Sequence, residues 1–177
     1  VGETNIEGWA EIFEEQKLES WRRGIEVNLT AAFHLCQGFA LMLSQKNGSI
    51  INIGSIYAEL GPDWRLYQGT EMANPAAYAV SKGGLIQVTR WLATTLAPKV
   101  RVNAISPGPT LKNKRQSDKH FNKQWKSVPL KKKVDLENIC NGVKFLIESK
   151  SITGEIINID GGQRLAWQTP DIINTKE

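Results

Sequence analysis

A regular stripe of apolar residues runs along the first part of the chain. Between positions 18 and 46, apolar residues recur in alternating steps of four and three, the spacing that keeps side chains on one face of a helix. The sequence therefore predicts a long amphipathic helix over residues 18–46. The stripe consists of Ile25, Leu29, Ala32, Cys36, Phe39 and Leu43, and a second apolar face is offered by Trp21, Ala31, Leu35 and Met42.

Three short apolar runs, each followed by glycine or proline, predict buried strands. The segment between the first two runs contains Asn74-Pro75, which predicts an N-cap followed by proline at the first helical position, and then a helix as far as about Leu96. Strand, helix and strand in this order make a βαβ unit. The three runs are residues 50–53, 100–105 and 154–159, and the second is halted by Pro107 and Gly108.

The remaining segments are less regular. Asp135 predicts the N-cap of a helix that continues through Glu148. The composition of residues 57–72 predicts a long loop. Residues 163–177 show no periodicity, and the sequence leaves two interpretations of this tail: an arm that contacts a partner subunit, or a loose end. The helix after Asp135 is expected to face inward with Ile139, Val143 and Leu146.

The candidate chemistry centres on Tyr78 and Lys82. Because residues four apart project from the same face of a helix, we expect the Lys82 ammonium beside the Tyr78 phenol, where its charge lowers the pKa of the phenol. A phenol with a pKa of about 10 is a poor base at neutral pH without such a shift. Ser55, at the end of the first strand, would hold a substrate oxygen in line, so these residues predict a proton-transfer site. On spacing alone, the alternative is a solvated helix face.

Composition indicates an ordinary globular protein. Hydrophobic residues make up 41% and charged residues 23% of the 177, enough for a core in one domain. There is no run of about eighteen apolar residues and no charged-then-apolar N-terminal segment, so we expect a cytoplasmic protein without a membrane span or signal peptide. Cys36 and Cys140 lie on apolar stripes and are expected to be buried reduced thiols, while His34 and His120 lack partners at metal-ligand spacing, so no metal site is expected.

The net charge of +4 is concentrated in residues 112–133, where Phe121 and Trp125 are interleaved with lysine and arginine. A basic and aromatic segment suits a solvated surface, a contact with a small anionic molecule, or a nucleic-acid surface. We favour the first two, and expect no nucleic-acid partner.

Five motifs in order resemble the short-chain dehydrogenase/reductase family. The interval from Asn28 to Ser55, 55 − 28 = 27 residues, is similar to that of the family, whereas the interval from Ser55 to Tyr78, 78 − 55 = 23 residues, is longer than in many members by a loop of about ten residues. The motifs are Val27-Asn28-Leu29, the strand ending in Ser55, Tyr78-x-x-x-Lys82, Asn103-x-x-x-Pro107-Gly108, and Ile152-Thr-Gly-Glu-Ile-Ile-Asn-Ile-Asp-Gly-Gly162.

The resemblance implies a Rossmann-like α/β fold, with flanking helices on the C-terminal part of a seven-stranded, doubly wound parallel sheet. Family members begin with a strand and a Gly-rich turn that seats the dinucleotide pyrophosphate, and no such turn is found near the start of this sequence. We therefore expect residues 1–177 to form a single partial Rossmann-type domain, a fragment or truncated form, with the strand at 50–53 left as an open edge.

The resemblance also implies roles for individual residues. In the reducing direction Tyr78 gives its proton to a carbonyl oxygen that Ser55 also binds. Lys82 bonds the nicotinamide ribose, Tyr78 also belongs to the cofactor-binding residues, and Asn28 completes a proton relay by holding a water. The cofactor is NAD or NADP, a choice that this sequence leaves open. The nicotinamide carboxamide side would be contacted by Pro107, Gly108 and Thr110.

The expected function is hydride transfer between a nicotinamide cofactor and a small-molecule carbonyl or secondary alcohol. The expected assembly is a homo-oligomer, a dimer or tetramer, that uses the helices at 18–46 and 78–96. The loop at 60–72 is similar to that of a subgroup associated with nonulosonate sugars, and its Trp64, Arg65 and Tyr67 would clamp a sugar or an anionic group unless the loop has no role. The alternatives are a 3-oxoacyl reductase-like enzyme and an inactive fragment that keeps subunit-contact and half-site elements.

Overall fold

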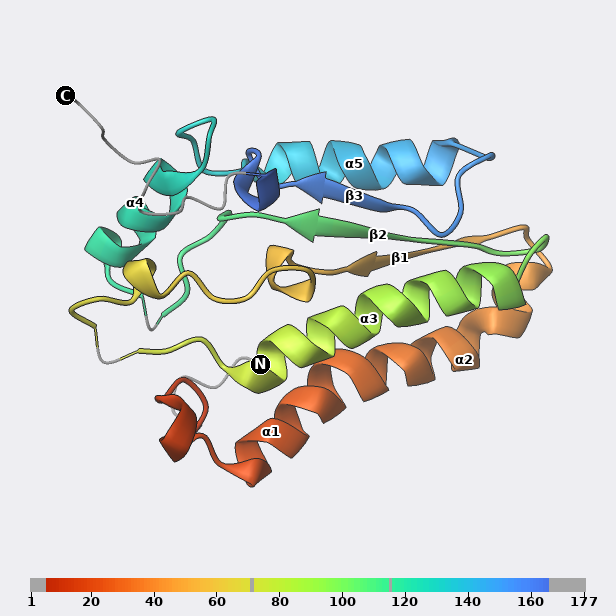
Figure 1. Cartoon of the computed structure of the whole chain (residues 1–177). Coiled ribbons are helices and arrows are strands. Elements are labelled where there is room, and N and C mark those ends of the chain that lie inside the picture. Colours follow the sequence, from red (N-terminus) through yellow and green to blue (C-terminus); the bar gives the residue numbers. More distant parts are fainter. Residues whose placement is uncertain (1–5, 71, 115, 166–177) are drawn as a thin grey trace.

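A three-stranded parallel sheet with helices on both faces forms the centre of the molecule (Figure 1). The structure is a computed structural model that describes residues 6–70, 72–114 and 116–165. The predicted α/β fold class is confirmed, and residues 166–177, where an arm or a loose tail was expected, lie outside the described residues. The strands are β1 (Ser49–Ile53), β2 (Arg101–Pro107) and β3 (Ile156–Ile159), in the spatial order β1-β2-β3.

The central strand β2 owes its apolar sequence to burial on both faces. Its Val102, Ala104 and Ile105 are completely buried, as is typical of a parallel strand covered by helices on each side. In register, Ile53 of β1 lies opposite Ile105, and Pro107 lies opposite Ile159 of β3. The parallel pairing brings the carboxyl ends of the three strands to one edge of the sheet.

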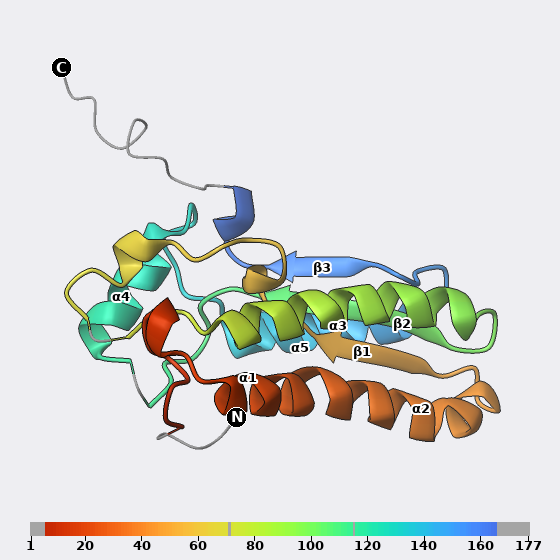
Figure 2. The ribbon, with the colours of Figure 1, turned by 60° about the horizontal axis from the view of Figure 1, so that its bottom comes forward.

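Helices α1 (Leu18–Ile25), α2 (Ala31–Ser44) and α3 (Ala76–Thr95) cover one face of the sheet, and α5 (Leu136–Glu148) covers the other (Figures 1 and 2). Helix α3 connects β1 to β2, and α5 connects β2 to β3, so each crossover packs on the strands that it joins. One core cluster fills the space between α2, α3 and the sheet. It consists of Cys36, Leu92, Ala93, Val100 and Val102.

The long helix predicted over residues 18–46 is present from Leu18 to Ser44, but a π-helical segment, Glu26–Thr30, interrupts it between α1 and α2. By length and composition alone this 27-residue helix could cross a membrane, a test that core helices also pass. Here α2 packs on α3 and β1, and it leaves several large apolar side chains exposed on its outer face.

The start of α3 differs from the prediction. Asn74 was expected to cap this helix, but Pro75 holds the N-cap position and Asn74 turns its amide to the Tyr67 hydroxyl, 3.2 Å away. Gln16 replaces it as the capping side chain, because its Oε1 accepts a hydrogen bond from the Ala76 N–H at 3.0 Å. The partner lies 60 residues away in the sequence, so no local capping pattern predicts it.

The basic segment at residues 112–133 contains helix α4 (Asp118–Ser127), which is capped by Ser117, whose Oγ accepts a hydrogen bond from the His120 N–H. Helix α5 begins after Asp135 as predicted, although no side-chain bond forms at that cap. Cys140 is exposed, whereas the sequence predicted a buried thiol there; Cys36 is buried as expected. The short 3₁₀ helices are Phe13–Glu15, Ile56–Ala58, Trp64–Leu66 and Gln163–Leu165.

Among the described strands, β1 pairs with β2 only, so no described strand pairs with its other edge, as the resemblance implied. Ile53, at the end of this strand, is 44% exposed. The backbone groups on such an edge are available to pair with a further strand.

Asn103 ties β2 to the turn before β3. It is completely buried; its Nδ2 donates to the Ile152 carbonyl and its Oδ1 accepts from the Glu155 N–H, both at 3.0 Å. The two bonds satisfy backbone groups that no strand pairing reaches, and they set the position at which β3 begins.

We predict that Asn103→Ala lowers the free energy of unfolding by about 1 to 3 kcal/mol, because it removes two hydrogen bonds made by a completely buried side chain. Urea denaturation of the native protein measures the change. Asn141, exposed on α5, provides the matched control, since Asn141→Ala should change stability by less than about 0.5 kcal/mol. Equal effects of the two substitutions would contradict the assigned role of Asn103.

Candidate active site

A cavity of about 410 Å³ lies at the carboxyl ends of β1 and β2. This position is where parallel α/β sheets bind their ligands. The wall is built from the end of β1, the start of α3, the turn after β2, helix α4, and Tyr67 with residues 72–75. Of the seven site residues predicted from sequence, six line the cavity: Asn28, Ser55, Tyr78, Pro107, Gly108 and Thr110.

Ser55 lies just beyond β1, where the strand turns into the short helix Ile56–Ala58. It is 6% exposed and caps that helix, because its Oγ accepts a hydrogen bond from the Tyr57 N–H at 3.2 Å. Its hydroxyl also hydrogen-bonds the Tyr78 side chain. Two separate contacts therefore fix this hydroxyl next to the phenol.

Tyr78 sits in the first turn of α3, with its ring 6.4 Å from that of Tyr57 in an edge-to-face arrangement. Burial raises the pKa of the Tyr78 phenol, and the hydrogen bond with Ser55 opposes that change in part. The phenol is therefore held in its protonated form at neutral pH.

Lys82 is one helical turn beyond Tyr78 and differs from the expectation. Its Nζ donates to the Ile53 carbonyl at 2.7 Å, and the Nζ lies 5.9 Å from the centre of the Tyr78 ring. It does not line the cavity. Burial lowers the pKa of Lys82 itself, and burial raises the pKa of the Tyr78 phenol, so the expected lowering of the phenol pKa is not found.

Asn28 lies in the π-helical segment and is partly buried, so its amide needs a partner. Its Nδ2 donates to the Ser81 Oγ at 3.2 Å, and the Ser81 hydroxyl donates in turn to the Tyr78 carbonyl at 2.8 Å. The amide thus supports the turn of α3 that carries Tyr78. A π turn widens the helix by one residue, which is a common device at functional sites.

The turn after β2 brings backbone to the cavity. A Cβ on Gly108 would lie 2.7 Å from the Asp160 Cα, so only glycine fits between β2 and the segment after β3. The Thr110 hydroxyl donates to the Gly108 carbonyl at 3.0 Å and keeps the turn closed. Pro107, Gly108 and Thr110 therefore form one rigid wall beside Tyr78.

The loop side chains expected to clamp a ligand behave differently from one another. Arg65 is turned to Asp63, with its Nε and Nη2 at 2.8 and 2.9 Å from the two carboxylate oxygens, and neither Arg65 nor Trp64 lines the cavity. Tyr67 does line it. The ion pair holds Nε and Nη2 of Arg65, and the residue does not line the cavity, so the clamp expected there is not formed by Arg65 in this structure.

Sequence reasoning missed two residues of this wall, Asn74 and His120. Both are 5% exposed and line the cavity. Asn74 was assigned to a helix cap, and His120 was considered only as a metal ligand. Within the described ranges, no group of three or more His, Cys, Asp or Glu side chains is placed to hold a metal ion.

Comparison with known proteins places this architecture in a family. A family model described as enoyl-(acyl carrier protein) reductase matches residues 5–164. The chain is 34% identical over 152 residues to a 3-oxoacyl-[acyl-carrier-protein] reductase of Rattus norvegicus, which covers 84% of this chain and 59% of the relative. A FabG protein of the same description from Thermotoga maritima is also 34% identical, over 82% of this chain and 58% of the relative.

Solved structures with a similar fold include a reductase and a short-chain dehydrogenase. The alternative dihydrofolate reductase FolM of Brucella suis, in complex with NADP, superposes with a TM-score of 0.78 at 34% identity, over 97% of this chain and 65% of that one. A short-chain dehydrogenase of Leptospira borgpetersenii with bound NAD+ gives the same TM-score and identity, over 91% and 62% of the two chains. The chain belongs to the short-chain dehydrogenase/reductase family. It spans about three fifths of the length of the curated relatives that it matches.

The raised pKa of Tyr78 predicts a late ionisation. In the native protein the phenol should lose its proton only above the pKa of a free tyrosine, about 10. Because the native state holds this proton more tightly than the unfolded chain, the stability that results is fully present below about pH 10 and is lost as the pH rises toward the native pKa.

An ultraviolet titration of the native protein, with Tyr78→Phe as reference, isolates the tyrosinate absorbance of this residue. One tyrosinate that appears in the difference spectrum below pH 10 would show that the Lys82 charge outweighs burial, contrary to the geometry found here.

Proposed function

We propose that the protein is an NAD(P)-dependent oxidoreductase that transfers hydride between nicotinamide and a carbonyl or secondary alcohol. The observation that carries the proposal is the hydrogen-bonded pair of Ser55 and Tyr78 in one cavity with the Pro107–Thr110 turn. Family membership supports it, as do relatives described as reductases and dehydrogenases.

Tyr78 acts as the general acid in the reducing direction. A phenol kept protonated by burial is suited to give its proton to a carbonyl oxygen as negative charge develops there. The Ser55 hydroxyl, fixed beside the phenol, donates a second hydrogen bond to the same oxygen. Binding the oxygen between two donors also orients the carbonyl carbon in the cavity.

The described residues fit the nicotinamide end of a dinucleotide. The wall of Pro107, Gly108 and Thr110 offers backbone groups and one hydroxyl within the cavity, and Gly108 keeps the approach free of a side chain. A nicotinamide held there would supply the hydride. NAD and NADP both remain in the proposal, since one solved neighbour is in complex with NADP and another has bound NAD+.

Lys82 and Asn28 support the proton donor. Lys82 donates a hydrogen bond to the Ile53 carbonyl at the end of β1. We assign it two roles: binding the nicotinamide ribose, and stabilising the tyrosinate that remains after proton transfer. Asn28 donates to Ser81 and so positions the first turn of α3. We also assign Asn28 to the proton relay that membership of the family implies.

A 3-oxoacyl reductase-like activity is the second candidate, because several relatives carry that description. An inactive fragment is the remaining alternative for the isolated segment. We propose that residues 1–177 form one part of a single Rossmann-type domain, a view that the one-sided pairing of β1 supports. The free state of both cysteines suits the cytoplasmic location included in the proposal.

We also propose a homo-oligomer that buries the outer faces of α2 and α3. Large apolar side chains stand exposed on these helices, and such patches mark protein contacts. On α3, Trp91 is 55% exposed. On α2 the exposed side chains are Phe33, Leu35, Phe39, Leu41 and Met42.

The first test of the function is Tyr78→Phe. We predict a fall in kcat for carbonyl reduction of about a hundredfold to ten-thousandfold with dinucleotide affinity nearly unchanged, because only the proton donor is lost. Lys82→Ala should weaken both turnover and dinucleotide binding. Turnover of the Tyr78→Phe protein within a few-fold of wild type, on any carbonyl substrate that the native protein reduces, would exclude Tyr78 as the acid.

The second test concerns the assembly. Replacing both Phe39 and Met42 by Glu should shift the native protein to a smaller species in light scattering, because buried charges would oppose the contact. Leu130→Glu, at a residue 69% exposed between α4 and α5, should leave the mass unchanged. A monomeric wild type at micromolar concentration would refute the proposed contact.

A further inference from the structure

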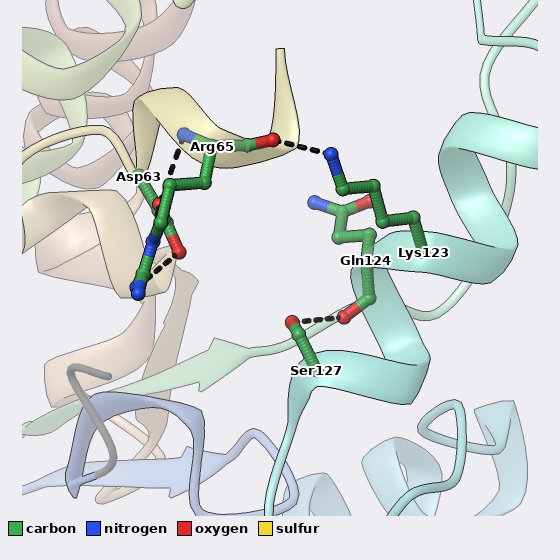
Figure 3. Close-up of polar contacts among 5 residues, drawn as sticks. All are labelled: Asp63, Arg65, Lys123, Gln124 and Ser127. Atoms are coloured by element: carbon green, nitrogen blue, oxygen red, sulfur yellow. Dashed lines mark hydrogen bonds and ion pairs between the residues drawn. The ribbon is translucent and has the colours of Figure 1, made fainter. Parts of the chain in front are cut away.

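The loop before α3 and helix α4 are joined into one wall of the cavity. Lys123 of α4 donates through its Nζ to the Arg65 carbonyl, while the Arg65 side chain turns to Asp63 (Figure 3). The rings of Tyr67 and His120 also join the loop to α4, with their centres 5.4 Å apart. The loop and α4 are therefore held together by contacts that do not use the polar groups facing the cavity.

Asn74 carries one unpartnered buried oxygen on this wall. Its Nδ2 donates to the Tyr67 hydroxyl at 3.2 Å, which fixes the amide plane. Its Oδ1 is buried without a hydrogen-bond partner, although the residue is 5% exposed and lines the cavity. A buried acceptor left unpaired costs about 1 to 3 kcal/mol, so its retention beside a cavity points to a ligand that supplies the donor.

His120 carries a second unpartnered polar atom. The residue lines the cavity, and its Nδ1 is buried without a hydrogen-bond partner. Burial, followed by the charge of Lys123, lowers the pKa of His120, so the ring is neutral and one of its nitrogens has a lone pair. We assign this lone pair to the unpartnered Nδ1, which makes it the second acceptor.

The two acceptors lie close to the proposed proton donor. Tyr67 shares side-chain hydrogen bonds with Asn74 and with Tyr57, and the Tyr57 ring packs edge-to-face on that of Tyr78. Burial raises the pKa of Tyr57, which keeps this phenol neutral as well. The wall between Tyr78 and His120 is thus a continuous set of neutral polar and aromatic side chains.

We propose that Asn74 and His120 are specificity-determining residues that bind O–H or N–H donors on the substrate, so that the cavity selects hydroxylated carbonyl compounds over alkyl or acyl chains. The proposal rests on the proposed function, because it assigns the substrate class of that site. It favours a polyhydroxylated substrate over the fatty acyl chain that the names of several relatives suggest. The physical reason is that an aliphatic chain would leave both acceptors buried without partners.

Dihydroxyacetone and diethyl ketone test the proposal, since they are similar in shape and differ by the exchange of two hydroxyls for methyl groups. Their dissociation constants are measured by NMR titration of the native protein with saturating NADPH or NADH, and their reduction is followed by nicotinamide absorbance. We expect dihydroxyacetone to bind at least about tenfold more tightly than diethyl ketone. Diethyl ketone has no O–H group, so its binding would leave the acceptors of Asn74 and His120 without hydrogen bonds.

Two variants remove the acceptors separately. Asn74→Leu deletes the amide, and His120→Phe keeps the ring against Tyr67 while deleting both nitrogens. Each should reduce the preference for dihydroxyacetone by about fivefold or more, with the dissociation constant of the dinucleotide unchanged. Gln87→Leu, at an exposed position on α3, is the control and should keep the wild-type preference.

Equal or tighter binding of diethyl ketone by the wild type, or no measurable binding of dihydroxyacetone, would overturn the proposal. So would an unchanged preference in both variants that fold with wild-type thermal stability. A preference for dihydroxyacetone that is lost in the variants, without nicotinamide oxidation by any ketone, would instead reject the proposed function and leave the binding assignment standing.

Discussion

The pairing of β1 with β2 under the crossover helix α3 is the constraint on which the rest of the site depends. The pairing aligns Ile53 with Ile105, so Ser55 beyond one strand and the Pro107 turn beyond the other open at the same edge of the sheet. Helix α3 must pack along both strands, which sets its first turn, with Tyr78, directly above that edge. Three parts of the site are thus positioned by one packed unit.

Burial sets the electrostatics of this site. The charge of Lys82 was expected to dominate the pKa of Tyr78, but the lysine is engaged by the Ile53 carbonyl, and desolvation acts on the phenol and the ammonium alike. A neutral phenol beside a neutral serine suits proton donation to an uncharged carbonyl. His120 follows the same rule, since burial and the nearby charge of Lys123 lower its pKa and keep the ring neutral.

The wall opposite the proton donor has a different origin. It is built by the long loop between Ser55 and Tyr78 together with α4, and its closure depends on Lys123, on the Tyr67 and His120 contact, and on the Asp63 and Arg65 ion pair. The residues proposed for proton transfer lie at the end of β1 and on α3, whereas the residues proposed to bind the substrate lie on this loop-and-helix wall. Under this proposal, substrate preference can change without disturbing Tyr78.

The sequence determined the secondary-structure elements and pointed to the residues proposed for proton transfer. Apolar periodicity and glycine or proline boundaries predicted the three strands, α3, α5 and the long helix, because those signals are local. Motif spacing placed Ser55, Tyr78 and Lys82. The same periodicity overlooked α4, whose amphipathic pattern is obscured by its many charges, and it assigned Cys140 to a buried stripe although that side of α5 faces outward.

Only the tertiary structure decided which side chains meet. Gln16 caps α3 from 60 residues away, Asn28 bonds Ser81, and Asn74 bonds Tyr67 in place of capping a helix. The direction of the Tyr78 pKa and the unpaired nitrogen of His120 likewise follow from burial among segments distant in sequence. Local patterns record the conformation of each segment, but desolvation and long-range hydrogen bonds depend on which segments pack together, and that information appears only in the folded chain.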